Sequence, residues 1–421
     1  MNSSETSVVV IGQGYVGLPL AMHAVRAGHT VTGIDLDRRR ADALAVGRSH
    51  VEDVSSDQVR AALDSGRYQV LGGYDGVGAW DVAVITVPTP LHEGRPDLAF
   101  VEQAAASIAS SLRAGAMVVL ESTTYPGTTE RVLVPILERG SGLVAGRDFS
   151  VGYSPERIDP GNGRWSFANT PKLVSGIDGT SLRRTQSFYD DLVQETIPVS
   201  GTREAELAKL LENTFRHVNI ALVNELAAHA DELGIDVWEA IDAAATKPFG
   251  FMKFTPGPGV GGHCLPIDPS YLSWEVKRAS GRTFRFVELA NDVNEHMPDH
   301  VVARATAMLN ARSKSVRGSR IALIGLSYKK NSGDIREAPS ARVIALLRAL
   351  GADLVGVDPH VEAHRWPVGV ERREPTSESL RDVDLAVLLT DHDDTDLEIL
   401  DGVPTFDSRN VMERSADVVV L

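Results

Sequence analysis

The fold of the N-terminal part of the chain is decided by the run Val8-Val9-Val10-Ile11-Gly12-Gln13-Gly14-Tyr15-Val16-Gly17. The run predicts a short buried strand that leads into a glycine-rich turn. The residues that follow, to about Gly28, have the pattern of a helix, and residues 30–34 predict a second strand that ends at Asp35. A strand, the spacing G-x-G-x-x-G, a helix, a strand and an acid together form the dinucleotide-binding fingerprint.

Each glycine of the turn has its own predicted task. Gly12 permits the tight turn, Gly14 lets a pyrophosphate approach the backbone, and Gly17 lets the helix pack closely on the strand. Tyr15 and Val16 complete the predicted cofactor turn, because N–H groups at the start of a helix can bind phosphate. The turn therefore predicts a bound dinucleotide.

The acid at the end of the second strand favours NAD over NADP. Asp35 lies 18 residues beyond Gly17, where its carboxylate can bind the ribose hydroxyls and would repel a 2′-phosphate. The basic run Arg38, Arg39 and Arg40 is the counter-argument. We interpret this run as the solvated start of a helix, and we count Arg40 among the predicted cofactor contacts. NAD is the expected cofactor.

The composition is that of an ordinary soluble globular protein, with 43% hydrophobic and 24% charged residues. The length of 421 residues predicts two or three domains. A single cysteine excludes a disulfide framework and a cysteine-rich metal site, and fits a reducing compartment. Without a signal peptide or a long apolar run, a cytoplasmic protein without a membrane partner is expected. The net charge of −15 argues against nucleic acid as a partner.

Further apolar runs at residues 82–87, 117–120 and 149–153 predict more buried parallel strands. In open α/β sheets, ligands bind outside the carboxyl ends of the strands. The candidate ligand contacts at such ends are Val87, Thr89, Thr124 and Glu156. Turn formation or helix capping is the alternative for each threonine, and a solvated loop carboxylate is the alternative for Glu156.

Residues 203–233 predict one long helix with no internal breaker. Its apolar stripe is formed by Leu207, Leu211, Phe215, Val218, Leu222 and Leu226. Lys209 and Asn213 are four residues apart and share a face away from that stripe. Lys209 could stabilise an anion, whereas a solvated lysine is the default. A helix of this length predicts a spine between domains or a subunit interface.

The one cysteine lies in the stretch Gly257-Pro258-Gly259-Val260-Gly261-Gly262-His263-Cys264-Leu265-Pro266-Ile267-Asp268-Pro269. Glycines permit positive φ angles and close approach of a ligand, and the prolines restrict the backbone further. A thiol on so particular a backbone suggests a nucleophile. The alternative is that Cys264 is a small buried hydrophobic residue, as free cysteines often are.

The C-terminal part repeats the strand-to-glycine opening of the chain. Residues 320–328 and 353–358 predict two strands of a second α/β domain, which lacks G-x-G-x-x-G and should bind a different nucleotide. Lys329 and Lys330, with the loop amides that follow, could hold a diphosphate. We expect an α/β protein with two Rossmann-like doubly wound parallel-sheet domains joined by a long central helix. The expected boundaries are an NAD-binding domain at 1–202, a central helical region at 203–312, and a second nucleotide-binding domain at 313–421.

Taken together, these motifs resemble those of the nucleotide-sugar 6-dehydrogenases, the UDP-glucose/GDP-mannose dehydrogenase family. The resemblance spans essentially the whole chain, from the NAD fingerprint through Pro155-Glu156 and the GGxC stretch to Glu337. It implies an enzyme that oxidises the C6 alcohol of a nucleotide-diphosphate sugar to the uronate with two NAD per turnover. It also implies that the domain at 313–421 binds the nucleotide sugar, and that the central dimerisation region at 203–312 forms a homodimer or higher homo-oligomer. No metal is expected.

The catalytic roles follow from the same resemblance. Cys264 matches the nucleophile that captures the C6 aldehyde as a thiohemiacetal, which becomes a thioester and is hydrolysed. Lys209, Asp268 and Asn213 match groups that stabilise and position the C6 oxygen. Glu156 matches the proposed general base, and Thr124 matches a residue that holds a water near C6.

The resemblance also implies the contacts to substrate and cofactor. Arg336 matches a contact to NAD. The matching substrate contacts are Glu156, Arg157, Lys209, Asn213, Lys253, Gly261, His263, Tyr328, Lys329 and Arg409.

The stretches Gly-Gly-His-Cys-Leu-Pro-Ile-Asp-Pro and Pro-Glu-Arg-Ile-Asp-Pro-Gly look most like the UDP-N-acetylhexosamine branch. UDP-N-acetylglucosamine or a related UDP-hexosamine is therefore the expected substrate. UDP-glucose or dTDP-glucose oxidation is the alternative. More remote alternatives are a two-electron hydroxyacid-type dehydrogenase and a redox-inactive NAD-binding sensor.

Overall fold

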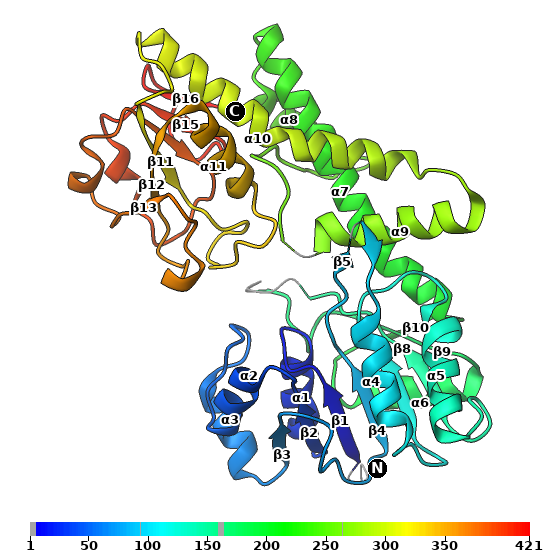
Figure 1. Ribbon diagram of the computed structural model, residues 1–421. Coiled ribbons are helices and arrows are strands. Elements are labelled where there is room, and N and C mark those ends of the chain that lie inside the picture. The colour runs from blue at the N-terminus through cyan, green and yellow to red at the C-terminus, as the bar shows by residue number, and fades with distance from the viewer. Residues whose placement is uncertain (1–5, 93, 159–163, 263) are drawn as a thin grey trace. The chain divides into compact units, whose positions relative to one another are not determined.

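The structure is a computed structural model that describes residues 6–92, 94–158, 164–262 and 264–421. It divides into two compact units, Met1–Glu212 with Ser270–Ser280, and Asn213–Pro269 with Gly281–Leu421. Each unit contains one mainly parallel β-sheet with helices packed against it, so the predicted α/β class is confirmed. Figure 1 shows both sheets, with β1 in the first unit and β11 in the second.

The first unit is built on an eight-stranded sheet in the order β10-β9-β8-β7-β4-β1-β2-β3. Its strands are β1 (Ser7–Ile11), β2 (Thr30–Ile34), β3 (Tyr68–Leu71), β4 (Val82–Ile85), β7 (Met117–Leu120), β8 (Ser150–Tyr153), β9 (Lys172–Gly176) and β10 (Thr196–Pro198), and a separate hairpin pairs β5 (Leu91–His92) with β6 (Arg95–Pro96). Its helices are α1 (Gly17–Arg26), α2 (Arg38–Ala45), α3 (Ser56–Asp64), α4 (Ala99–Ala109), the π-helical turn η1 (Thr129–Leu133), α5 (Val134–Ser141) and α6 (Gly179–Asp190).

Successive residues of the central strands enter two different cores, as the period of two in a strand requires. Val8 and Val10 of β1 belong to a core that α1, α3 and α6 cover. Val9 and Ile11 belong to a core that α4 and α5 cover. Helices therefore cover both faces of the sheet (Figure 1), which explains why its strands read as continuous apolar runs.

One pair of strands departs from the parallel pattern. β9 runs antiparallel to β8, while β10 runs parallel to β9. A parallel neighbour needs a crossover connection, usually a helix. The segment between β8 and β9 forms no helix in the parts of it that the structure describes, so the chain returns in the opposite direction. The sequence did not predict β9 or β10.

The second unit is built on a six-stranded parallel sheet in the order β13-β12-β11-β14-β15-β16. Its strands are β11 (Arg320–Ile324), β12 (Asp353–Val357), β13 (Glu371–Arg372), β14 (Leu385–Leu388), β15 (Thr405–Asp407) and β16 (Val418–Val420). Its helices are α8 (Val237–Ala245), α10 (Arg285–Ala311), α11 (Pro339–Leu350) and the 3₁₀ turns η2 (Ala363–Arg365), η3 (Glu378–Leu380) and η4 (Leu397–Leu400). α10 and α11 lie side by side over one face (Figure 1), and η3 and η4 contribute to the core on the other.

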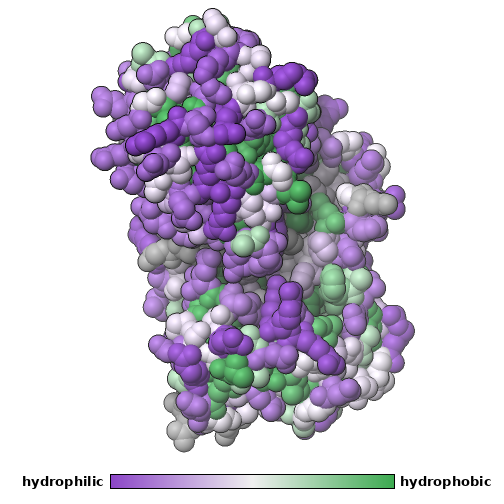
Figure 2. All heavy atoms as spheres, turned by 60° about the vertical axis from the view of Figure 1, so that its left-hand side comes forward, coloured by the Kyte–Doolittle hydropathy of each residue, from purple (hydrophilic) through white to green (hydrophobic). Residues whose placement is uncertain are grey.

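Two helices carry the residues of most interest: α7 (Thr202–Leu233), which matches the predicted long helix, and α9 (Cys264–Ser280). The apolar stripe of α7 faces outward, because Leu211, Leu222 and Leu226 are 60%, 53% and 49% exposed. The polar pair on the opposite face is buried, with Lys209 8% and Asn213 6% exposed. The default interpretation of Lys209 as a solvated lysine is therefore wrong. Figure 2 shows other apolar residues that reach the surface among hydrophilic ones.

Within the described parts of the chain, every helix is too short or too polar to cross a membrane.

Candidate active site

The glycine-rich turn has the geometry that a dinucleotide requires. Gly12 has a φ of +94°, and a Cβ there would lie 2.8 Å from the carbonyl oxygen of Thr86. A Cβ on Gly17 would lie 1.9 Å from the carbonyl oxygen of Gly12. A Cβ on Gly14 would instead meet nothing within 4 Å, so the backbone of Gly14 is open on the side where a pyrophosphate would approach. The residues present thus fit NAD.

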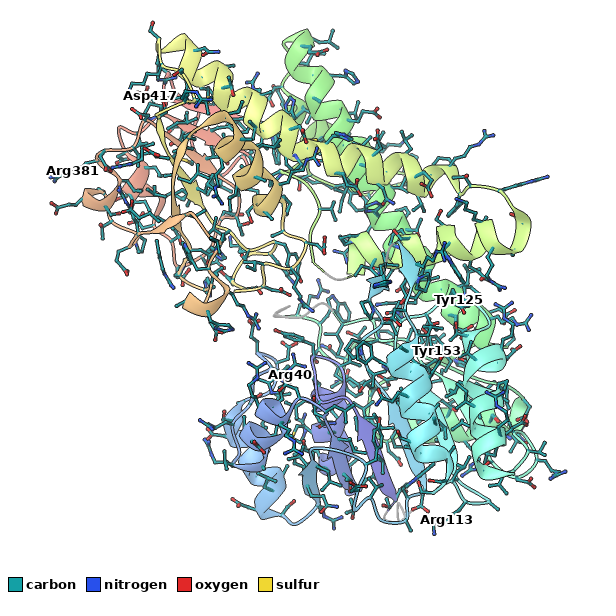
Figure 3. All side chains as sticks on the ribbon, viewed as in Figure 1. Arg40, Arg113, Tyr125, Tyr153, Arg381 and Asp417 are labelled. Carbon is teal, nitrogen blue, oxygen red and sulfur yellow. The ribbon has the colours of Figure 1, made fainter. Side chains whose placement is uncertain are left out.

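Asp35 follows β2 directly and is held against this turn. Its Oδ2 accepts a hydrogen bond from the Gln13 backbone N–H at 3.0 Å, and its Oδ1 accepts one from the Asp37 N–H at 2.9 Å. The carboxylate is therefore fixed beside the turn that would carry the phosphates. Arg40 projects from α2 and is exposed (Figure 3), with Nε 3.8 Å from Asp37 Oδ2, as expected of a solvated helix start.

The residues at the ends of β4 and β7 hold their loops in place. The Val87 carbonyl accepts a bond from Ser122 Oγ at 2.7 Å, and the buried Thr89 has its carbonyl bound by the Tyr271 hydroxyl at 2.9 Å. Thr124 is fully buried, and its hydroxyl donates to Thr128 Oγ1 at 2.5 Å. In this structure the Thr124 hydroxyl thus stabilises the turn that follows β7.

Glu156 follows β8 and is a well-anchored carboxylate. Its Oε1 accepts hydrogen bonds from the backbone N–H groups of Arg157 and Ile158 at 2.6 and 2.7 Å. Its Oε2 accepts one from Lys172 Nζ at 3.1 Å. Its side chain is only 13% exposed, so the alternative of a solvated loop carboxylate is wrong. Burial would raise the pKa of Glu156, but the Lys172 ammonium and the Ile158 N–H hold that pKa below its usual value.

Lys209 reaches the same segment from α7. Its Nζ donates to the carbonyl oxygen of Glu156 at 2.5 Å. The neighbouring Arg157 binds the Glu212 carboxylate, with Nη2 to Oε1 at 2.7 Å, and donates to the Pro171 carbonyl at 2.7 Å. The first unit thus brings the ammonium of Lys209 and the backbone of Glu156 together, while the guanidinium of Arg157 is used in an ion pair.

A further acid on α7 was missed by the sequence analysis. Glu206 is fully buried and accepts hydrogen bonds from the Gly127 N–H, the Thr129 N–H at 2.9 Å and the Thr129 hydroxyl at 2.7 Å. It lies one turn before Lys209 and joins α7 to the loop that carries Thr124. Burial raises its pKa to about 7, although these donors oppose the shift. The only sequence signal was a carboxylate in the helix next to a candidate lysine.

The second unit contains the cysteine stretch and its aspartate. Cys264 is the first residue of α9, and Asp268 lies one turn further along that helix and is buried. The side-chain amide of Asn213 donates a hydrogen bond to the Asp268 carboxylate. His263, a predicted substrate contact, lies outside the described residues. The structure therefore brings together Asn213 and Asp268, two residues that the sequence placed 55 positions apart.

The glycines before the cysteine are packed against the C-terminal sheet domain. A Cβ on Gly261 or Gly262 would lie 2.6 Å from the side chain of Tyr328, and the Gly262 N–H donates to the Arg336 carbonyl at 3.1 Å. A Cβ on Gly257 would lie 3.0 Å from an Nη1 atom of Arg409. Three of the predicted ligand contacts therefore border the cysteine stretch.

A buried network of side-chain hydrogen bonds, which the sequence did not predict, anchors the same stretch. The Gly257 N–H donates to Asn224 Oδ1 at 2.9 Å, and Asn224 Nδ2 donates to Asn294 Oδ1 at 2.9 Å. Asn294 in turn lies 3.4 Å from His217 Nδ1. Asn224 sits on α7, so the loop is tied to that helix by side-chain amides that look like ordinary surface residues in the sequence.

The remaining basic candidates differ in their surroundings. The ammonium of Lys253 is paired with Asp242, and Arg336 donates three hydrogen bonds to Asp334. Arg409 is partly buried beside Asp391, with its Nε 3.5 Å from Oδ1, and desolvation lowers its pKa. Lys329 is half-buried directly after Tyr328. Lys253, Arg336 and Arg409 thus each lie beside a carboxylate of their own unit.

Comparison with known proteins places three family models on the chain. The NAD-binding domain of the UDP-glucose/GDP-mannose dehydrogenase family matches residues 6–193, its central domain matches 203–296, and its UDP-binding domain matches 322–414.

Individual relatives match over most of their length. The UDP-N-acetyl-D-mannosamine dehydrogenase of Methanococcus maripaludis is 31% identical over 98% of this chain and 95% of its own. The UDP-N-acetyl-D-glucosamine 6-dehydrogenase of Pseudomonas aeruginosa is 35% identical over 85% of this chain and 84% of its own. The solved structure of a UDP-D-ManNAc dehydrogenase from Pyrococcus horikoshii superimposes with a TM-score of 0.89 at 30% identity, covering 98% of each chain.

Proposed function

Because the chain belongs to the UDP-glucose/GDP-mannose dehydrogenase family of NAD-dependent nucleotide-sugar dehydrogenases, we propose that it oxidises the C6 alcohol of a UDP-N-acetylhexosamine to the carboxylate. UDP-N-acetylglucosamine or a related UDP-hexosamine is the proposed substrate, since the named relatives act on such sugars. UDP-glucose or dTDP-glucose is the second candidate. We further propose a cytoplasmic enzyme with domain boundaries near residues 202 and 312.

The observation that carries the proposal is the arrangement at the start of α9. Cys264 opens this helix, whose N-terminal end favours negative charge, and Asp268 one turn later is held by Asn213. We assign Cys264 as the nucleophile that adds to the C6 aldehyde. The resulting thiohemiacetal loses a hydride to give a thioester, which water hydrolyses to the carboxylate.

The other residues have supporting roles in this scheme. Bound NAD supplies the hydride acceptor for each oxidation, and Gly12, Gly14, Gly17 and Asp35 would hold it. Lys209 stabilises the oxygen at C6 when that oxygen carries negative charge, because an ammonium is most effective in a buried site. Glu156 takes up a proton, and Thr124 shapes the loop beside it. In the second unit, Asn213 and Asp268 position the C6 oxygen.

Recognition of the nucleotide is assigned to the residues around the cysteine stretch. Tyr328, Lys329 and Arg409 would bind the diphosphate and base, with Lys253, Arg157, Gly261 and His263 as further substrate contacts. Arg336 and Arg40 remain proposed contacts to NAD, as do Tyr15, Val16, Val87 and Thr89 in and beside the cofactor turn.

The substrate assignment is tested with a panel of nucleotide sugars scored by NADH yield. UDP-N-acetylglucosamine, UDP-N-acetylmannosamine and UDP-N-acetylgalactosamine should include the best substrate. A clear preference for UDP-glucose or dTDP-glucose would instead establish the second candidate.

We predict that NAD is used at least about tenfold more efficiently than NADP, because the Asp35 carboxylate repels a 2′-phosphate at close range. Asp35→Asn keeps an oxygen that can accept the Gln13 N–H and removes the charge. This variant should therefore lower the ratio of kcat/KM with NAD to kcat/KM with NADP. Equal efficiency of the wild-type enzyme with both cofactors would rule the assignment out.

We predict a homodimer or higher homo-oligomer that covers the outward stripe of α7. Leu211, Leu222 and Leu226 are about half or more exposed, and such a row on one helix is typical of a subunit interface. Leu222→Arg should lower the mass measured by light scattering at micromolar concentration. Leu350→Arg is the matched control, since Leu350 is 43% exposed on α11 and should leave the mass unchanged. A wild-type monomer would contradict the proposal.

A further inference from the structure

Glu156 belongs to a buried cluster of ionisable side chains, and the scheme above uses only Glu156 among them. Lys172, the first residue of β9, has Nζ 3.1 Å from Glu121 Oε1 and 3.1 Å from Glu156 Oε2. The Tyr189 hydroxyl of α6 donates to the same Oε1 of Glu121. We call Glu121, Lys172, Glu156 and Tyr189 the Lys172 cluster. The side chains of Lys172 and Glu121 are 4% and 0% exposed, so the ammonium bridges the two carboxylates away from water.

The charges of the cluster do not balance. Within the cluster, two carboxylates face one ammonium in a site with little access to solvent, and the Lys209 ammonium outside the cluster acts on Glu156. Glu121 is therefore the less compensated carboxylate, and an uncompensated buried charge is costly. Burial raises the pKa of Glu121 to about 7, against the opposite effect of the Lys172 ammonium. The pKa of Glu156 is lowered instead, so a proton that the cluster takes up resides on Glu121.

We propose that Glu121, Lys172 and Glu156 form a proton relay in which Glu121 stores the proton that Glu156 takes up during catalysis. The inference rests on the proposed role of Glu156. Two features of the geometry carry it: one ammonium touches both carboxylates, and Glu121 Oε2 makes no hydrogen bond to the described residues. The Glu121 carboxylate is therefore stabilised by fewer donors than that of Glu156, which makes Glu121 the better proton acceptor of the two.

The transfer balances without any other reactant. A proton from the reacting alcohol or water binds Glu156 Oε2. Lys172 Nζ donates one of its protons to Glu121 Oε1 and receives the proton from Glu156. The ammonium and the Glu156 carboxylate are thereby restored, Glu121 is neutral, and the cluster has changed from one negative charge to none. No electrons move.

The relay also resolves a difficulty with Glu156 as a base. A carboxylate held by two backbone N–H groups and an ammonium binds a proton weakly, whereas an efficient base has a pKa near the working pH. Glu121 meets that condition, and Glu156 gives it access to the reaction. The charged and titratable groups that face the two carboxylates are Lys172 from β9, Tyr189 from α6 and Lys209 from α7.

Glu121→Gln tests the relay, because glutamine keeps an oxygen for Lys172 and Tyr189 and cannot take a proton. We expect kcat to fall by about tenfold or more, and the rise of kcat with pH near 7 to disappear. Tyr189→Phe is a second test: it removes the donor that lowers the pKa of Glu121 and should move the rise in kcat to higher pH. A Glu121→Gln enzyme with wild-type kcat and pH profile would overturn the relay, even if its melting temperature fell.

Glu156→Gln separates this proposal from the proposed function. If Glu156→Gln is inactive while Glu121→Gln and Tyr189→Phe leave the pH profile unchanged, the relay is wrong and the role of Glu156 stands. If Glu156→Gln keeps wild-type kcat, Glu156 takes no proton and both assignments fall. If Glu121→Gln does not fold, the Tyr189→Phe profile decides: a shift to higher pH supports the relay, and an unchanged profile overturns it.

Discussion

Cys264→Ala is expected to abolish formation of the uronate. Without the thiol, the C6 aldehyde cannot be captured as a thiohemiacetal, so the carbon that must lose the second hydride is not formed on the protein. The variant should form no covalent adduct with the sugar, which intact-protein mass spectrometry checks directly. Two NADH per sugar from Cys264→Ala, at a rate near that of the wild type, would mean that the cysteine is a packing residue.

Cys264→Ser is the informative partner of that variant. Serine keeps a nucleophilic oxygen of higher pKa, so an ester can form but should be hydrolysed very slowly. We expect a stable adduct with the mass of the sugar nucleotide, or a stall after a trace of NADH. Because serine and alanine are both small, any difference between the two variants reports the nucleophile rather than the packing of the loop.

Lys209→Ala is expected to lower kcat by about 10²–10³-fold, while KM changes little. Lys209 is 8% exposed and its ammonium is held by the Glu156 carbonyl, and the charge matters most when the C6 oxygen is anionic. Removing one well-placed oxyanion contact typically costs about 3–4 kcal/mol of barrier. Initial-rate kinetics over a range of sugar-nucleotide concentrations separates kcat from KM.

Arg216→Ala is the control for Lys209, because Arg216 lies on the same helix and is exposed. It should leave kcat and KM unchanged. A Lys209→Ala enzyme with the kcat of the control would remove Lys209 from the mechanism.

The architecture could be predicted because it depends on local patterns. The fingerprint from Val8 to Gly17 uses glycines for reasons of backbone geometry, and a Cβ at Gly12 or Gly17 would collide with backbone atoms. Buried parallel strands read as apolar runs because both faces are covered. The long helix has no breaker, and its predicted and observed starts differ by one residue.

Which side chains are buried could not be predicted, because burial depends on packing between segments that are distant in sequence. The apolar stripe of α7 correctly predicted a helix, but it did not predict which face of that helix is buried within the chain. The stripe is exposed, and Lys209 lies on the buried face. Lys172 and Glu121 are 51 positions apart in the sequence. They meet because β9 runs antiparallel to β8, and no local sequence pattern predicted that direction. Asn224 and Glu206 were missed for the same reason, since each acts on a loop distant in sequence.

The central claim is that one protein carries out both oxidations of the sugar through Cys264. The most direct test is the number of NADH formed per nucleotide sugar consumed, measured by absorbance with limiting sugar and excess NAD, with the product identified by mass. The account predicts two NADH and a uronate, with no free aldehyde. One NADH per sugar, with the aldehyde or ketone as the final product, would contradict it.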